Sequence, residues 1–257
     1  MRLVVKIGTS TLAHPTGHLN IRLVEELCKI ISDIKNAGND VTLVSSGAIG
    51  MGVGKLGLRK RPEDIPTKQA AAAVGQCELM YTYDKIFSEY NLTVAQILIT
   101  GEDIADEGRH LNFKNTLNRL LELDVIPIIN ENDTVATEEL GIGDNDTLAA
   151  IVAKSIGADK LILLSDIDGL FTADPHKDKN ATLISHIDKI DKNVLALGGE
   201  SILGQGTGGM ATKLEAAKIC TAAGCDMVIA NGNRPANLYD IIDGKSVGTT
   251  FSGGKND

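Results

Sequence analysis

The sequence has very few aromatic residues: Trp is absent, and Phe, Tyr and Trp together make up 3% of 257 residues. Hydrophobic residues nevertheless reach 43%, so the core must consist mainly of Ile, Leu, Val and Ala, which suits a buried parallel sheet covered by helices. Charged residues account for 23%, near the globular average, which argues against wholesale disorder. A chain of this length can form a single α/β domain.

Basic stretches and long apolar runs are also missing. The formal net charge is −9, and without an arginine-rich run we expect no nucleic-acid partner. An anionic small molecule stays possible, because a few lysines and aligned N–H groups supply positive charge locally. No apolar run reaches the ~18 residues of a membrane helix, and the N-terminus becomes polar too early for a signal peptide. We therefore expect a cytoplasmic protein with no membrane partner.

Cysteine is scarce and shows no ligand pattern. The four cysteines form no CxxC pair, and no His/Cys cluster has zinc spacing, so we predict no metal site built from protein ligands. We expect all four to be small buried hydrophobic side chains; they are Cys28, Cys77, Cys220 and Cys225.

Short apolar runs alternate with amphipathic segments along the chain. Strands are predicted at 3–7, 41–44, 92–99, 125–129, 160–164 and 227–230. Helices are predicted at 21–34, 66–90, 111–123, 146–156, 209–223 and 236–242, the first capped by Asn20 and followed by Gly38. This alternation predicts a mostly parallel sheet. No linker is evident, so we expect two lobes on one continuous sheet.

Four predicted strands run into polar or glycine-rich residues at their carboxyl ends: 6–10, 45–47, 130–133 and 165–166. Ligands of open α/β sheets bind beyond these ends, so the four together predict the rim of one site. Lys6 lies within an apolar strand. It either extends from a sheet edge or points at a phosphate, and Gly8, which permits close backbone approach, favours the phosphate.

Glycine patterns suggest two different ligands. Gly52-x-Gly54-x-x-Gly57 and Gly204-x-Gly206-x-x-Gly209 formally match a dinucleotide fingerprint, but no convincing strand leads directly into either. A P-loop is excluded around Lys55, because Ile49 and Leu56 stand where that motif needs Gly and Ser or Thr.

The stretch 206–213 opens a predicted helix. Glycines there let free N–H groups turn toward an anion, and the helix macrodipole favours negative charge at this end. Lys213 lies in the first turn. This combination predicts phosphate binding.

The segment 143–147 is acidic. Asp144 or Asp146 could cap the following helix, as Asp often does, while the other orients lysines or a metal ion. Asn145 offers both a donor and an acceptor to a substrate amino acid.

With these motifs, the sequence resembles the amino acid kinase family, and within it the members that phosphorylate glutamate. The matching stretches follow one another over nearly the whole chain: 5–10, 44–48, 69–76, 126–134, 143–146, 164–169 and 207–213. Ile142 stands where such enzymes usually carry Phe, which is an apolar change.

The resemblance implies an α/β fold, a three-layer αβα sandwich with a mostly parallel central sheet. It implies a single domain over 1–257, with a substrate lobe at about 1–158 and a nucleotide lobe at about 159–257. Many bacterial members also carry a C-terminal PUA domain, which we do not expect here.

Roles follow by matching motifs. The resemblance implies that Lys6 and Lys213 contact the transferring phosphoryl group and that Asp146 holds both lysines. Glutamate would be bound by Ser46, Gly47, Asp133 and Asn145. ATP would be bound by Lys6, Gly8, Ser165, Asp166, Thr207, Gly208, Gly209, Met210, Ala211, Thr212 and Lys213.

The same resemblance implies the reaction: ATP, with Mg²⁺, phosphorylates the side-chain carboxylate of L-glutamate to L-glutamyl 5-phosphate, the first step of proline biosynthesis. It also implies a homo-oligomer, dimer or tetramer, and L-proline as a possible inhibitor. Three alternatives stay open: a sister kinase acting on N-acetylglutamate, aspartate, carbamate or UMP, a nucleotide sensor without catalysis, and a dinucleotide oxidoreductase.

Overall fold

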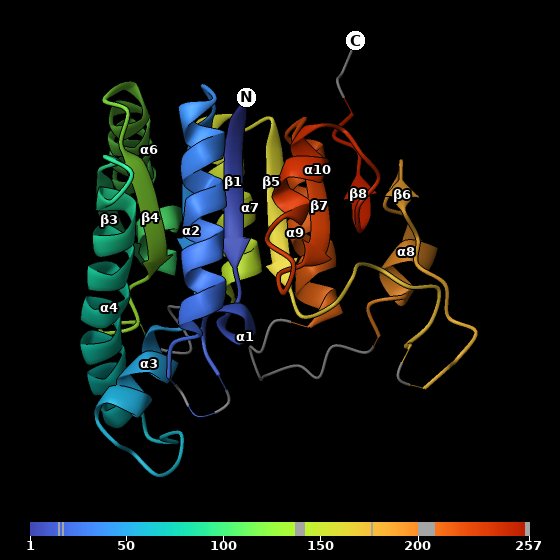
Figure 1. The fold of residues 1–257 in the computed structure, drawn as a ribbon. Helices are drawn as coiled ribbons and strands as arrows, with labels where there is room; N and C mark the ends of the chain where they lie inside the picture. Colours follow the sequence, from blue (N-terminus) through green and yellow to red (C-terminus); the bar gives the residue numbers. More distant parts are fainter. Residues whose placement is uncertain (15, 17, 137–141, 176, 200–208, 255–257) are drawn as a thin grey trace.

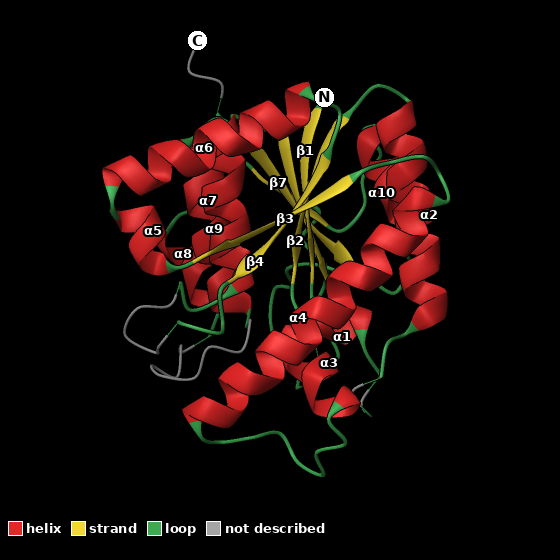
Figure 2. Cartoon of the chain, turned by 90° about the vertical axis from the view of Figure 1, so that its left-hand side faces the viewer, coloured by secondary structure: helices red, strands yellow, loops and turns green. Residues whose placement is uncertain are grey.

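A computed structural model describes residues 1–14, 16, 18–136, 142–175, 177–199 and 209–254. Within these residues one eight-stranded sheet carries helices on both faces (Figures 1 and 2). The strands are β1 (Arg2–Ile7), β2 (Asp40–Ser45), β3 (Val94–Ile99), β4 (Ile126–Glu131), β5 (Lys160–Ser165), β6 (His186–Ile187), β7 (Asp226–Asn231) and β8 (Thr249–Phe251).

The strand order is β3-β4-β2-β1-β5-β7-β8-β6. Every pair from β3 to β7 is parallel, whereas β8 runs antiparallel to β7 and pairs in parallel with β6. The predicted mostly parallel, continuous sheet is confirmed. The strands β6 and β8 were not predicted, because two or three residues are too few to show a periodic pattern.

The described helices are α1 (Thr9–Leu12), α2 (Ile21–Asn36), α3 (Ala48–Lys55), α4 (Ile65–Ser88), α5 (Gly101–Ala105), α6 (Glu107–Glu122), α7 (Asn145–Ile156), α8 (Lys192–Ala196), α9 (Met210–Ala222) and α10 (Asn237–Ile242). Asn20 caps α2 as predicted, accepting a hydrogen bond from the backbone N–H of Leu23 at 3.4 Å. Gly38 follows α2 with φ +90°. None of the described helices combines the length and apolarity that a bilayer span requires.

The glycine-rich stretch after β2 forms α3, a helix that the sequence did not predict. Gly52 on α3 and Gly75 on α4 permit close contact between the two helices: a Cβ on Gly52 would lie 1.8 Å from the carbonyl oxygen of Ala71, and one on Gly75 would lie 1.7 Å from that of Ala48. Gly52 therefore serves helix packing.

Two hydrophobic cores lie on opposite faces of the sheet. Figure 2 shows α2, α4 and α10 on one face and α6, α7 and α9 on the other. Because side chains alternate along a strand, Leu3, Val5 and Ile7 of β1 enter the α2–α4 core, and Val4 enters the α7–α9 core. The three-layer αβα sandwich is confirmed.

The prediction of buried cysteines holds for three of the four. Cys28, Cys220 and Cys225 are buried, but Cys77 is exposed. Cys77 follows the buried Gln76 on α4, and because neighbouring helix positions lie about 100° apart, it faces solvent. The expectation was wrong for this residue.

Candidate active site

The four predicted polar strand ends lie at one edge of the sheet. They follow β4, β2, β1 and β5, which are consecutive parallel neighbours in the strand order, and the arrows of β4, β1 and β5 end at the lower edge in Figure 1. Ile7, near the end of β1, is in register with Ser45 of β2 and with Leu164 of β5. The predicted rim therefore exists as a continuous edge.

Lys6, Asp146 and Lys213 form one buried ionic cluster at this edge. The Lys6 Nζ lies 2.7 Å from Asp146 Oδ1, and the Lys213 Nζ donates to Asp146 Oδ2 at 3.1 Å. The three residues are 8%, 1% and 3% exposed, respectively. Lys6 shares the α7–α9 face of β1 with Val4, because two positions along a strand point the same way. Since β1 lies inside the sheet, the sheet-edge alternative for Lys6 is wrong.

The two lysines keep Asp146 ionised. Burial opposes its charge, but Lys6 and Lys213 outweigh that effect and hold the pKa of Asp146 below its usual range. Thr212 Oγ1 also donates to Asp146 Oδ2, at 3.0 Å. The cluster brings two lysines to one carboxylate. The N-termini of α7 and α9 add positive potential, so the arrangement favours an anionic ligand.

The choice between Asp144 and Asp146 as helix cap is resolved. Asp144 caps α7: its Oδ1 accepts from the backbone N–H of Thr147 at 2.8 Å, and its Oδ2 accepts from the Thr147 hydroxyl at 2.8 Å. Asp146 is thereby left to contact the lysines. This division matches one of the two alternatives that the sequence left open.

Several of the predicted nucleotide-binding residues surround the cluster. A Cβ on Gly8 would lie 3.6 Å from Lys6 Nζ, so the backbone of Gly8 passes close to that ammonium group. Ser165 ends β5, the neighbour of β1, and its hydroxyl donates to Asp166 at 3.0 Å.

The start of α9 completes this side of the site. Gly209 is the N-cap of α9 and makes no side-chain cap hydrogen bond. Met210, Ala211 and Thr212 form the first turn with Lys213. The predicted residues Thr207 and Gly208 lie outside the described residues.

The residues predicted to bind the phosphoryl acceptor, glutamate, lie on the β2–β4 side of the cluster. The Asn145 side-chain amide donates to Ser46 Oγ at 2.8 Å, to the Ser45 carbonyl at 3.2 Å and to Asn130 Oδ1 at 3.0 Å. Gly47 is the N-cap of α3 with φ +100°, a backbone conformation that glycine adopts readily. The structure thus brings Ser46 and Asn145 together next to Asp146.

Asp133 is half-buried in the turn after β4. The pKa of Asp133 is raised to about 6, mainly by burial and also by the neighbouring Glu131 carboxylate, while Arg61 partly opposes the shift. Burial also raises the pKa of Glu131, although its carboxylate accepts a hydrogen bond from the backbone N–H of Ile142 at 2.7 Å. Asp133 therefore changes charge close to neutral pH.

Sequence analysis missed two residues behind this side of the site. The buried amide of Asn130 donates to the buried Gln76 at 2.9 Å, while its oxygen accepts from Asn145. Both occur in stretches that resemble the amino acid kinases; Asn130 belongs to the predicted rim 130–133 but was given no role, and Gln76 was not assigned to the site. A polar side chain at an inward-facing position of an apolar strand or helix was the available signal.

A metal site built from protein ligands is absent from the described part of the chain, where no group of three or more His, Cys, Asp or Glu residues could hold an ion. Both oxygens of Asp146 already contact lysines.

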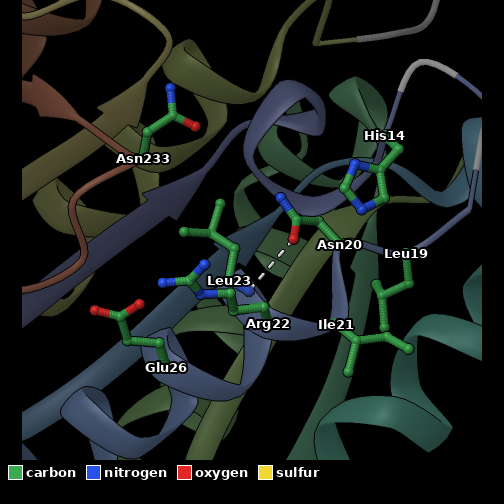
Figure 3. Close-up of a pocket in the computed structure, with 8 residues that line it drawn as sticks. All are labelled: His14, Leu19, Asn20, Ile21, Arg22, Leu23, Glu26 and Asn233. Carbon is green, nitrogen blue, oxygen red and sulfur yellow. Dashed lines mark hydrogen bonds between the residues drawn. The ribbon is translucent and has the colours of Figure 1, made fainter.

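A separate surface hollow of about 620 Å³ lies at the N-terminus of α2, where His14, Arg22, Glu26 and Asn233 are among its lining residues (Figure 3). None of the predicted site residues lines it. Asn20 points into this region but is engaged as the cap of α2, as the dashed line in Figure 3 marks. The ionic cluster, which gathers Lys6 and Lys213 on Asp146 at the sheet edge, is the better candidate for a reaction centre.

Comparison with known sequences identifies the family. Residues 1–231 match the profile described as the amino acid kinase family. The chain belongs to the amino acid kinase family. A glutamate 5-kinase of Clostridium tetani is 54% identical over 250 residues, covering 97% of this chain and 94% of that protein. One from Caldanaerobacter subterraneus is 51% identical over 256 residues, covering 100% of this chain and 69% of that protein.

Solved structures of the amino acid kinase fold agree with the architecture. Isopentenyl phosphate kinase of T. acidophilum, in a product complex, aligns with a TM-score of 0.66 at 19% identity over 98% of this chain and 100% of that chain. UMP kinase of Bacillus anthracis aligns with a TM-score of 0.65 at 19% identity over 98% and 96%. At this identity the likeness shows the fold of this amino acid kinase family member.

Proposed function

We propose that this chain is a glutamate 5-kinase, which transfers the γ-phosphoryl group of ATP to the side-chain carboxylate of L-glutamate. The products are ADP and L-glutamyl 5-phosphate, and the reaction is the first step of proline biosynthesis. Two buried lysines facing one carboxylate, Lys6 and Lys213 on Asp146, are the observation that carries this proposal. Relatives of that name, about half identical over nearly the whole chain, support the choice of substrate.

The nucleophile needs no general base. The side-chain carboxyl of glutamate has a pKa of ~4.3 and is ionised near neutrality, so one of its oxygens can attack the γ-phosphorus directly. The bond that forms joins this oxygen to phosphorus, and the bond that breaks joins phosphorus to the oxygen bridging to ADP. The predicted catalytic residues include no histidine, which fits a reaction without proton abstraction.

The obstacle is electrostatic, because two anions must approach each other. We assign Lys6 and Lys213 to the transferring phosphoryl group, where they offset charge that develops in the transition state. Asp146 fixes both ammonium groups before substrate binds, so little reorganisation is needed during the reaction. Mg²⁺, bound to the nucleotide, supplies further charge neutralisation.

Each of the two substrates is assigned to one side of the ionic cluster. Glutamate is assigned to Ser46, Gly47, Asp133 and Asn145 in the lobe of about residues 1–158. In this assignment the Asp133 carboxylate faces the α-ammonium group, and the Ser46 hydroxyl, which accepts from Asn145, keeps its own hydrogen for a carboxylate.

The nucleotide is assigned to the lobe of about residues 159–257 together with β1. Free N–H groups at the start of α9 suit phosphate oxygens, and Gly8 leaves room beside Lys6. Ser165 and Asp166 adjoin this edge, and the same assignment includes Gly209, Met210, Ala211, Thr212, Thr207 and Gly208, the last two outside the described residues.

The proposal extends to assembly and regulation. We expect a cytoplasmic homo-oligomer, a dimer or tetramer. Two features support assembly: β3 ends the sheet with one unpaired edge, and Tyr81 on the adjoining α4 is 63% exposed. Light scattering after size exclusion measures the mass.

L-Proline, which carries the same ammonium and α-carboxylate groups as glutamate, is expected to compete at the glutamate site, and a rate unchanged by proline would contradict this.

An acceptor panel tests the substrate assignment. ADP release is measured with ATP, Mg²⁺ and either L-glutamate, N-acetyl-L-glutamate, L-aspartate, carbamate or UMP. We expect turnover with L-glutamate. Turnover with another acceptor alone would identify a sister kinase, and ATP binding without ADP release on any acceptor would favour the nucleotide sensor.

A further inference from the structure

A chain of side-chain amides connects the outer strand of the sheet with the candidate glutamate site. The Asn145 amide donates to Asn130 Oδ1 at 3.0 Å, the Asn130 amide donates to Gln76 Oε1 at 2.9 Å, and the Gln76 amide donates to Gln96 Oε1 at 3.3 Å. Asn130 and Gln76 are 2% and 7% exposed, whereas Gln96, on β3, is exposed. In each of these three hydrogen bonds, the NH₂ group that donates points away from the candidate glutamate site.

One backbone group sets this direction. The backbone N–H of Glu131 donates to Asn130 Oδ1 at 2.9 Å, and a backbone N–H cannot act as an acceptor. The Asn130 oxygen must therefore face Glu131, which places its NH₂ group against Gln76. Gln76 can satisfy that buried NH₂ group only with its own oxygen, so a 180° turn of either amide would bring like atoms together.

The consequence for Asn145 is that its donors are used up. An amide NH₂ group has two hydrogens, and here it meets three acceptors, from Ser45, Ser46 and Asn130. No group in the described residues donates to Asn145 Oδ1, so this oxygen is what the side chain can still offer a ligand. The expectation that Asn145 presents both a donor and an acceptor is thereby corrected.

We propose that Gln76 is a positioning residue that, through Asn130, locks the amide of Asn145 with its oxygen toward the substrate, and so makes the site selective for a free α-ammonium group. This inference rests on the proposed function. Glutamate with both carboxylates ionised has hydrogen-bond donors only on its ammonium group. An acceptor at Asn145, together with the Asp133 carboxylate, therefore binds that group and gains nothing from a dicarboxylate that lacks it.

The test compares two ligands that differ in the ammonium group. The KM for L-glutamate and the inhibition constant of glutarate, which is glutamate without its amino group, are measured for Gln76→Leu, Gln76→Glu and Gln96→Leu. Gln76→Leu removes the acceptor for the Asn130 NH₂ group. We expect its KM for L-glutamate to rise about 10-fold, the loss of one hydrogen bond to a charged group, with the KM for ATP and the inhibition constant of glutarate unchanged.

The other two variants separate positioning from general damage. Gln76→Glu keeps an oxygen facing Asn130, and the exposed Gln96 can turn its amide to match, so its KM for L-glutamate should stay within about threefold of wild type. Gln96→Leu removes only the outer end and should leave the KM for L-glutamate unchanged. Should Gln76→Leu or Gln76→Glu fail to fold, Asn145→Ala, which removes the oxygen assigned to the ammonium group, should raise the KM for L-glutamate more than it alters glutarate inhibition.

Any one of three results for Gln76→Leu would overturn the inference. The first is an equal change for L-glutamate and glutarate, and the second is an accompanying rise in the KM for ATP. The third is a KM for L-glutamate that stays at the wild-type value. Absence of wild-type turnover with L-glutamate would instead contradict the proposed function, so the two failures are distinguishable.

Discussion

The Lys6 Nζ lies 2.7 Å from Asp146 Oδ1, and this contact joins the central strand of the sheet to the first turn of α7. Lys213, from the first turn of α9, contacts the other oxygen of the same carboxylate. Three elements that are far apart in the sequence thus converge on one ionic group. An orientation fixed in advance is what phosphoryl transfer between two anions requires.

Loss of Lys213 should affect the chemical step more than glutamate binding. In Lys213→Ala we expect kcat to fall by about 10²–10³-fold, the range for removing one group that stabilises transition-state charge, with the KM for L-glutamate changed less than about threefold. Steady-state kinetics with both substrates measures this. Lys218, which is half-buried on the same helix and pairs with Glu215, provides the matched control, and Lys218→Ala should retain wild-type kinetics. An unchanged kcat in Lys213→Ala would exclude the assigned role.

Removal of the Asp146 carboxylate should destabilise the fold. Asp146→Ala removes the carboxylate that two buried ammonium groups contact, and breaking a buried ion pair costs about 3–5 kcal/mol. Asp144→Ala, two positions earlier, removes a helix cap and should cost only about 1 kcal/mol. Urea unfolding of both variants compares the two free energies. Equal losses would mean that the ionic cluster contributes nothing beyond an ordinary cap.

The pH dependence of glutamate use should report on Asp133. Its pKa is raised to about 6, so the carboxylate becomes neutral below that pH and loses its attraction for the α-ammonium group. We expect kcat/KM for L-glutamate to decrease about tenfold per pH unit below this value, while glutamate itself stays ionised down to a pH of ~4.3.

Asp133→Asn is the control for that titration. It should lower kcat/KM for L-glutamate at neutral pH and flatten the profile between pH 5 and 7, because the group that titrates is gone. A variant that keeps the acidic decline would assign it to another group, with Glu131, whose pKa is also raised, as the next candidate.

The close contact between α3 and α4 gives a test of packing. Gly52→Ala would place a methyl group 1.8 Å from the Ala71 carbonyl oxygen, so the helices must separate, at a cost of about 3 kcal/mol or more. Gly50→Ala, on the same helix, meets only the Thr9 side chain at 3.7 Å and should be neutral or stabilising by up to about 1 kcal/mol. Thermal unfolding of the two variants measures the difference, and similar melting temperatures would contradict it.

Much of the fold could be predicted from the sequence because its signals are local. Apolar runs of strand length alternate with helical patterns, and Asn20 and Gly38 mark the ends of α2. By contrast α3, rich in glycine, has poor intrinsic helix propensity, and its packing depends on the close approach of Gly52 to α4. The strand β8 depends on pairing with β7, a contact that no local pattern records.

The site was predicted only in part, because motifs identify single residues but do not show which residues contact one another. Motifs indicated Lys6, Asp146 and Lys213 individually, but the sequence left open which aspartate caps α7, because both occupy suitable positions. Only the packing of α7 against β1 and α9 separates the two. Gln76 went unassigned because its role depends on a contact with Asn130, which belongs to a different element.

The most direct test of the account traps the product. Purified protein is mixed with ATP, Mg²⁺ and L-glutamate in hydroxylamine, which converts an acyl phosphate to a hydroxamate, and ADP is measured in parallel. We predict hydroxamate and ADP in equal amounts, dependent on L-glutamate. ADP formed without hydroxamate, or no ADP despite measurable ATP binding, would contradict phosphorylation of the glutamate side-chain carboxylate.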